Sequence, residues 1–180
     1  DWDMHETSWD FKGSPLLANK TDGLIESAYE AYKNQVNHRF AKLKENEEEL
    51  NRIFIEIYGL EDELTPQVAD KDITVAKIFD SKKEIYDEIK GNRYIMTREE
   101  VVKNFLSYFI GCLIGRYSLD EEGLAFAGGD FDIGKYISFK ADEDGILPFT
   151  DNHYFEDDIL ESFIKFLKVT FGEENLNEHL

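Results

Sequence analysis

An uninterrupted helical pattern over about residues 22–58 constrains this chain more than any other feature. Its apolar residues follow steps of three, four or seven positions, which is the period of one face of an α-helix. Glu47 takes the one place where another apolar residue is expected, no proline interrupts the segment, and Gly59 is a natural stop. The sequence predicts one unbroken amphipathic helix, roughly 55 Å long at 1.5 Å per residue. The stripe consists of Ile25, Tyr29, Tyr32, Val36, Phe40, Leu43, Leu50, Phe54 and Ile57.

We do not expect a helix of that length to be packed along all of it in a chain of 180 residues. Two interpretations remain open. The helix pairs with another helix as a long hairpin, or it spans two bodies of a larger protein. Glu47 should lie at a wet gap or near a cation, because a buried unpaired carboxylate is costly.

The chain therefore divides into residues 1–20, 21–59 and 60–180. The first part reads as an extended arm, and its two tryptophans, Trp2 and Trp9, favour docking of aromatic side chains over an ordinary terminal tail. The second part is the long connector helix, and the third is a small helical domain.

The third part opens with a connection and a short strand or extended stretch over residues 73–79, followed by a short helix over residues 81–90. Thr97 and Glu100 then have the spacing of a capping box, which predicts the start of a helix running to Leu113. This helix is apolar on most sides, so we expect it to be the central core helix.

Residues 124–151 are rich in Gly, Asp and aromatic residues, which predicts a compact irregular loop or a minor β element. A last helix is expected from about Glu156 to Phe171, and residues 173–180 look like the truncated start of another. The fold class is mainly α: a long amphipathic helix plus a small helical core.

The composition limits the partners and the compartment. Asp and Glu number 39 against 20 Lys and Arg, and the formal net charge of −19 repels phosphate, so the chain alone should not bind nucleic acid strongly. Cys112 is the single cysteine, which excludes an intramolecular disulfide and a zinc site built on paired cysteines. No apolar run is long enough for a membrane span, and there is no signal peptide. Because the chain starts at Asp1, we expect an internal fragment of a longer cytoplasmic protein.

The sequence lacks the motifs of common catalytic and cofactor-binding sites. There are no two adjacent prolines and no Gly-rich phosphate or cofactor loop, since Gly134-Lys135 is followed by Tyr136. The four histidines are far apart in sequence. The sequence therefore predicts no catalytic, cofactor-binding or metal-binding residue. Glu88 and Lys90 resemble part of a metal-dependent nuclease set, but a solvated helix face explains them better.

One basic stretch stands out against the acidic background. Lys33, Arg39, Lys42 and Lys44 lie in a segment without Asp or Glu, and on a helix they could contact the phosphates of DNA. The alternative is that they are the charged flanks of a packed helix.

Three stretches resemble a known family. They are ETSWDF before PLL at residues 6–17, NEEELNRIFIEIYGL running into ELTPQV at residues 46–68, and GCLIGRYSLDEEGLAFAGG at residues 111–129. Together they resemble the large adenine-specific DNA methyltransferases of BREX phage-defence systems, the PglX type, which are similar to fused restriction–modification enzymes. The resemblance continues to Leu180 and is weakest over residues 76–100.

This resemblance implies that the methyltransferase core lies in another part of a longer polypeptide. The parent would use S-adenosylmethionine to methylate adenine N6, whereas this chain would hold no cofactor. The chain would be a noncatalytic spacer or specificity-associated domain, with the rest of the parent as its partner and duplex DNA reached through the parent. The alternative is an acidic protein-interaction module that docks other defence-complex subunits or phage proteins.

Overall fold

A computed structural model describes residues 2–149 and 158–179, and it confirms the mainly α fold class. The α-helices are α1 (Pro15–Ala18), α2 (Ile25–Tyr58), α3 (Arg98–Leu113), α4 (Ile159–Phe171) and α5 (Leu176–His179). The strands are β1 (Lys77–Phe79) and β2 (Ile95–Thr97). Short 3₁₀ turns cover Trp2–Met4, Asp70–Asp72, Lys82–Glu84, Asp87–Ile89, Ile133–Lys135 and Glu173–Asn175. No helix within these ranges is both long and apolar enough to cross a membrane.

The chain forms two compact units. Residues 33–101 make up the first, which we call the sheet unit, and the described residues of 2–32, 102–149 and 158–179 make up the second, the aromatic unit. Helix α2 contributes its first turns to the aromatic unit and the rest to the sheet unit. The division into 1–20, 21–59 and 60–180 that the sequence indicates follows the elements along the chain, whereas the aromatic unit combines two segments far apart in sequence and α2 is shared between the units.

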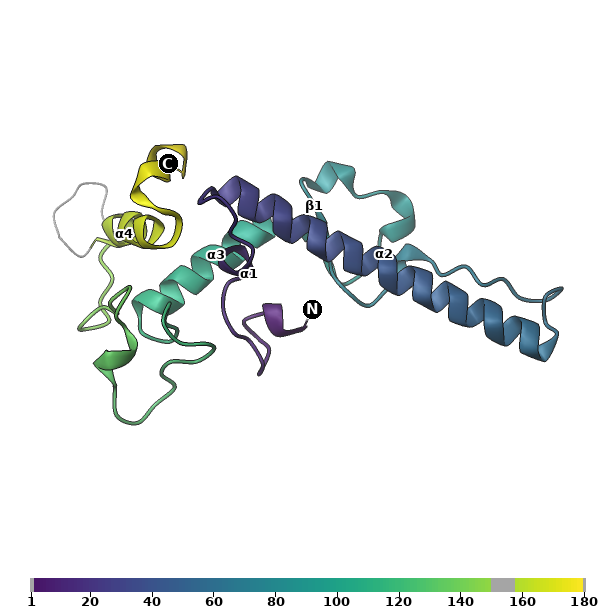
Figure 1. Cartoon of the computed structure of the whole chain (residues 1–180), viewed down its shortest axis with the longest axis horizontal. Helices are drawn as coiled ribbons and strands as arrows, with labels where there is room; N and C mark the ends of the chain where they lie inside the picture. The colour runs from purple at the N-terminus through teal and green to yellow at the C-terminus, as the bar shows by residue number, and fades with distance from the viewer. Residues whose placement is uncertain (1, 150–157, 180) are drawn as a thin grey trace. The chain divides into compact units, whose positions relative to one another are not determined.

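Helix α2 runs unbroken over 34 residues, as the apolar period predicts, and it is the long helix of Figure 1. Its end is set by Gly59, whose φ of 63° lies in the left-handed region that favours glycine. The amide of Gly59 donates to the carbonyl of Glu56 at 3.2 Å, and the amide of Leu60 donates to that of Ile55 at 3.0 Å. These two bonds form a Schellman motif, which satisfies carbonyls that the last turn leaves unpaired.

In the sheet unit, the partner of α2 is extended chain and not a second helix. The residues after the turn run back beside α2, as Figure 1 shows, and hydrogen bonds tie them to it at intervals. Glu48 accepts from the amide of Val68 at 3.1 Å, and Asn37 bonds both backbone groups of Ile78 at 2.9 and 3.0 Å. The core beneath consists of Phe40, Ile73, Phe79 and Ile89, all buried.

Strands β1 and β2 form a two-stranded parallel sheet, with Ile78 opposite Met96. Strand β2 leads directly into α3, and the Glu100 carboxylate accepts from the Thr97 amide at 2.6 Å, as the capping box predicts. The α-helix expected over residues 81–90 is wrong. The described chain there forms two separate 3₁₀ turns, because Ile85 and Tyr86, which pack against the core, have extended backbone conformations that interrupt a helix.

The aromatic unit is built around α3 and α4. Phe105 and Phe109 of α3 pack against Phe166 of α4, with ring centroids 5.8 and 5.2 Å apart. Residues 124–149 form an irregular loop, in which Tyr136 is buried and donates its hydroxyl to the carbonyl of Gly115. The expected start of the last helix at Glu156 lies outside the described residues, and the helix ends before Gly172 as predicted.

Candidate interaction surfaces

The four cations of the basic stretch lie on α2 but do not share one face. Lys33 and Lys44 are three helical turns apart and so point the same way, whereas Arg39 and Lys42 point to other sides. The ammonium of Lys33 lies 2.6 Å from the Asp80 carboxylate. Lys42 is exposed and lies 2.7 Å from Glu45, while Arg39 is half-buried. Folding thus brings carboxylates from other segments to lysines of the basic stretch, although the stretch itself contains no acidic residue.

Asp70 collects several of these interactions. Its carboxylate lies 2.6 Å from the Lys44 ammonium and 3.9 Å from the Lys77 ammonium, and it accepts a hydrogen bond from the Tyr86 hydroxyl. Burial alone would raise the pKa of Asp70, but the hydrogen bonds from Lys44 and Tyr86 outweigh burial and lower it. The bond to Asp70 also raises the pKa of Lys44. A phosphate that approached Lys44 would have to compete with a carboxylate already in place.

The far end of α2 carries an exposed apolar surface, which we call the tip stripe. It consists of Leu50, Ile53, Phe54, Ile57 and Tyr58, at helical spacings of three and four residues. The sequence identifies three of these residues as part of the apolar stripe, but it does not show that the core ends before them. Glu47, which is half-buried, lies where the stripe changes from buried to exposed.

A groove of about 350 Å³ lies between this end of α2 and the chain that follows it. Phe54, Ile55 and Tyr58 line it from the helix, and Leu60 and Leu64 line it from the other side. Asn51 donates to the carbonyl of Pro66 at 3.2 Å, which holds the two sides together. The groove and the tip stripe form one continuous apolar end.

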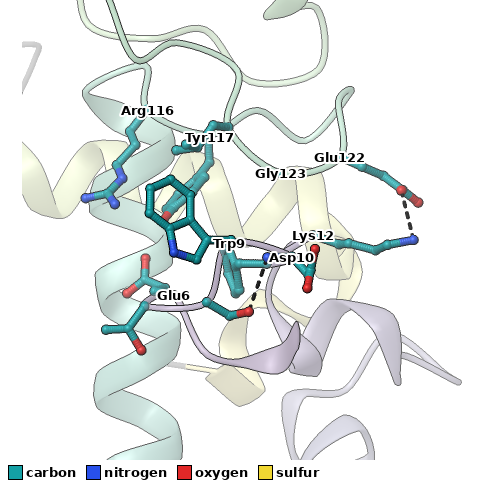
Figure 2. Close-up of a pocket in the computed structure, with 12 residues that line it drawn as sticks. Glu6, Trp9, Asp10, Lys12, Arg116, Tyr117, Glu122 and Gly123 are labelled. Carbon is teal, nitrogen blue, oxygen red and sulfur yellow. Dashed lines mark hydrogen bonds and ion pairs between the residues drawn. The ribbon is translucent and has the colours of Figure 1, made fainter. Parts of the chain in front are cut away.

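A second pocket of about 670 Å³ lies in the aromatic unit (Figure 2). The indole of Trp9 is fully exposed and stands over this pocket, and Glu6 and Arg116 lie near the indole. Arg116 stacks on the buried ring of Tyr117, 5.3 Å from the ring centroid. Burial, and then the Glu6 carboxylate, raise the pKa of Tyr117. The pocket therefore offers an aromatic face beside charges of both signs.

The arm expected at the start of the chain is partly packed. Phe11 is buried, with its ring centroid 5.2 Å from that of Tyr117, and Leu16 is buried as well. Both Trp2 and Trp9 are exposed, so docking of the tryptophans stays a prediction.

Other acidic and basic groups have local structural roles. Among the residues that the structure describes, no cluster of His, Cys, Asp and Glu could hold a metal ion. The Asp142 carboxylate accepts a hydrogen bond from the amide of Gly145 at 2.7 Å, and this bond closes a turn of acidic residues. Glu88 is an exposed residue of the 3₁₀ turn Asp87–Ile89, and Lys90 pairs with Asp87.

Two curated relatives match the chain along its whole length. It is 44% identical over 186 aligned residues to the adenine-specific methyltransferase PglX of Lacticaseibacillus casei (strain Zhang), and 34% identical over 187 to the adenine-specific methyltransferase BrxX of Escherichia coli O9:H4 (strain HS). The alignments cover 100% of this chain but only 14% and 15% of these relatives. No protein-family model matches the chain. The resemblance seen in the sequence is thus confirmed: this chain is similar throughout to one segment of PglX-type adenine-specific methyltransferases.

Proposed function

We propose that this chain is a noncatalytic spacer or specificity-associated domain of an adenine-specific DNA methyltransferase in phage defence. The observation that carries the proposal is the match of the whole chain to about a seventh of two such enzymes. The parent would act in the cytoplasm with S-adenosylmethionine, and it would flip the target adenine out of the duplex to reach N6.

The unbroken helix α2 supports a spacer role. It enters both compact units, and a continuous helix transmits position better than a loop of the same length. Its end is fixed by the bonds at Gly59 and Leu60 and by the chain that returns beside it. In this proposal the rest of the parent is the main partner, and duplex DNA is reached through the parent.

A flexible α2 tests the spacer role in the full-length protein. Asn34 and Gln35 are exposed positions of α2, and changing both to Gly costs about 2 kcal/mol of helix stability relative to changing both to Ala. We expect the Gly variant to bind S-adenosylmethionine as the wild type does but to methylate DNA with a lower kcat/KM. The Ala variant is the control and should keep both properties. If the Gly variant lost affinity for S-adenosylmethionine by the same factor as it lost kcat/KM, the chain would help to form the cofactor site.

The isolated chain gives a second test. We expect it to bind no S-adenosylmethionine, because its sequence contains neither a cofactor loop nor the proline-rich catalytic loop of such enzymes. Calorimetric titration is the measurement, and saturable binding of one S-adenosylmethionine per chain would overturn the noncatalytic assignment.

An acidic protein-interaction module is the second candidate function, and the Trp9 pocket favours it. The indole is fully exposed, and three carboxylates against two cations line its pocket, so the site suits a cationic side chain of a partner protein. The net charge of −19 also attracts basic proteins. Other defence-complex subunits or phage proteins would be the partners. Trp9→Ala should then weaken recovery of a partner with the full-length protein while leaving DNA methylation unchanged, with Trp2→Ala as the control.

A further inference from the structure

The apolar stripe of α2 continues beyond the core that covers its first half. Tyr32 and Phe40 are each 2% exposed, whereas Phe54, Ile57 and Tyr58 are 55%, 68% and 70% exposed. The helical spacing of the stripe does not change across this boundary. The sequence thus maintains an apolar face for about two turns where the described part of this chain leaves it exposed.

This apolar end is held in a defined shape. The turn at Gly59 is closed by two backbone hydrogen bonds, and Asn51 ties the helix to the carbonyl of Pro66. Leu64, itself exposed, extends the apolar area across the groove of about 350 Å³. A preformed apolar surface with a groove loses little entropy on binding, which is the property of a docking site.

The charges around the tip stripe select the partner. Glu49 and Glu56 lie on the other face of the same turns and are paired with the Arg52 guanidinium, at 2.6 and 3.4 Å, so they point away from a partner that covers the stripe. Residues 61–63, between the groove residues Leu60 and Leu64, place three exposed carboxylates beside the groove. A second copy of this chain would bring like charges together, so charge disfavours self-association through this end. An apolar site rimmed by Lys and Arg is complementary to it.

We propose that the tip of α2 docks into an apolar, cation-rimmed groove in the part of the full-length polypeptide that lies outside this chain. This inference rests on the proposed function, in which the chain is a segment of a longer methyltransferase. The two relatives carry about six-sevenths of their length outside the matched segment, so a covering surface has ample chain to come from. A site in the same polypeptide also acts at a high effective concentration.

Site-specific photocrosslinking in the full-length protein tests the docking. With p-benzoyl-phenylalanine in place of Phe54, we expect an intramolecular crosslink whose yield does not depend on protein concentration. Mass spectrometry should place it in a peptide with apolar residues and at least one Lys or Arg. The same crosslinker at Arg52, on the opposite face, should give no such product.

A matched pair of variants separates docking from loss of folding. Ile57→Gln in the crosslinker protein should abolish the product, whereas Glu56→Gln, one residue away on the other face, should keep it. A crosslink to a second copy, a crosslink to another protein, or no crosslink would overturn the proposal. DNA methylation is measured on the same preparation: an active enzyme without the crosslink would refute the docking and leave the proposed function standing.

Discussion

Gly111 shows how one missing side chain shapes the aromatic unit. A Cβ added there would lie 2.4 and 2.7 Å from the ring of Tyr117, which is too close for any carbon contact. That ring cannot easily move, because it is buried and stacks on Tyr108 with centroids 5.3 Å apart. We therefore expect Gly111→Ala to lower the free energy of unfolding by about 1 to 3 kcal/mol, as overpacking does.

Urea denaturation of the purified chain measures this change. Gly13→Ala is the control, because a Cβ at Gly13 meets only the Tyr108 side chain, at an ordinary 3.5 Å from its hydroxyl. An unchanged denaturation midpoint for Gly111→Ala would mean that Tyr117 has room to shift.

Cys112 has the environment of an inert core residue. Its side chain is buried in α3, and burial raises the pKa of the thiol to about 12. The thiolate is the reactive form, so at about pH 8 we expect iodoacetamide to label the folded chain far more slowly than the urea-unfolded chain. Mass spectrometry over time gives both rates, and fast labelling without denaturant would show that α3 opens readily.

At the scale of elements, Asp70 links the chain that returns beside α2 to the helix itself. The pKa of this carboxyl is lower in the folded chain than its usual value of about 3.9. A group whose pKa falls on folding contributes stability above its unfolded pKa and loses it as the pH drops through the folded pKa. Stability should therefore decrease below about pH 4, in part because Asp70 takes up a proton.

Asp70→Asn removes this contribution. We expect it to cost about 1.5 to 3 kcal/mol near neutral pH, since it weakens hydrogen bonds to a charged group that is largely buried. The variant should also lose less stability than the wild type between about pH 5 and pH 3. Urea denaturation across that range is the measurement, and Asp62→Asn, at an exposed position of the same unit, is the control. Parallel pH profiles for wild type and Asp70→Asn would contradict this account.

The elements differ in how far the sequence predicts them. Helix α2 and the start of α3 at Thr97 follow from apolar period and capping chemistry, which act between residues close in sequence. The chain returning beside α2 does not, because its bonds join Glu48 to Val68 and Lys44 to Asp70, which are far apart in sequence. Such side-chain pairings leave no period in the sequence. The two 3₁₀ turns within residues 81–90 escape prediction for the same reason, since the packing of Ile85 and Tyr86 against the core depends on distant segments.

At the scale of the whole molecule, the sequence reveals the candidate surfaces only in part. The run without carboxylates extends only from residue 31 to residue 44 of one helix, and folding brings Asp80 and Asp70 to Lys33 and Lys44 from other segments. The exposed tip stripe has the same period as the buried stripe, because period alone shows which face is apolar and not whether anything covers it. Exposure depends on where the core ends, and that is a property of the assembled unit.

DNA binding is the remaining test of the basic stretch. With a net charge of −19, the isolated chain should bind random duplex DNA no more tightly than about 10⁻⁴ M at physiological salt. If the full-length protein uses this stretch, changing Lys33, Arg39, Lys42 and Lys44 to Gln should weaken binding to all sequences alike, because phosphate contacts position without specifying. The salt slope should become shallower by up to about one unit for each phosphate interaction that the substitutions remove.

The control changes Lys71, Lys82, Lys83 and Lys90 to Gln, which removes as many positive charges from exposed positions of the same unit. Fluorescence anisotropy at several salt concentrations compares both variants with the wild type, and circular dichroism checks folding, since Lys33 and Lys44 also hold Asp80 and Asp70. A change confined to the first variant, with folding retained, would mean that phosphates displace these carboxylates. Equal affinity and slope in the two variants would mean that the basic stretch serves the ion pairs of the sheet unit alone, and the DNA contact would have to come from another part of the polypeptide.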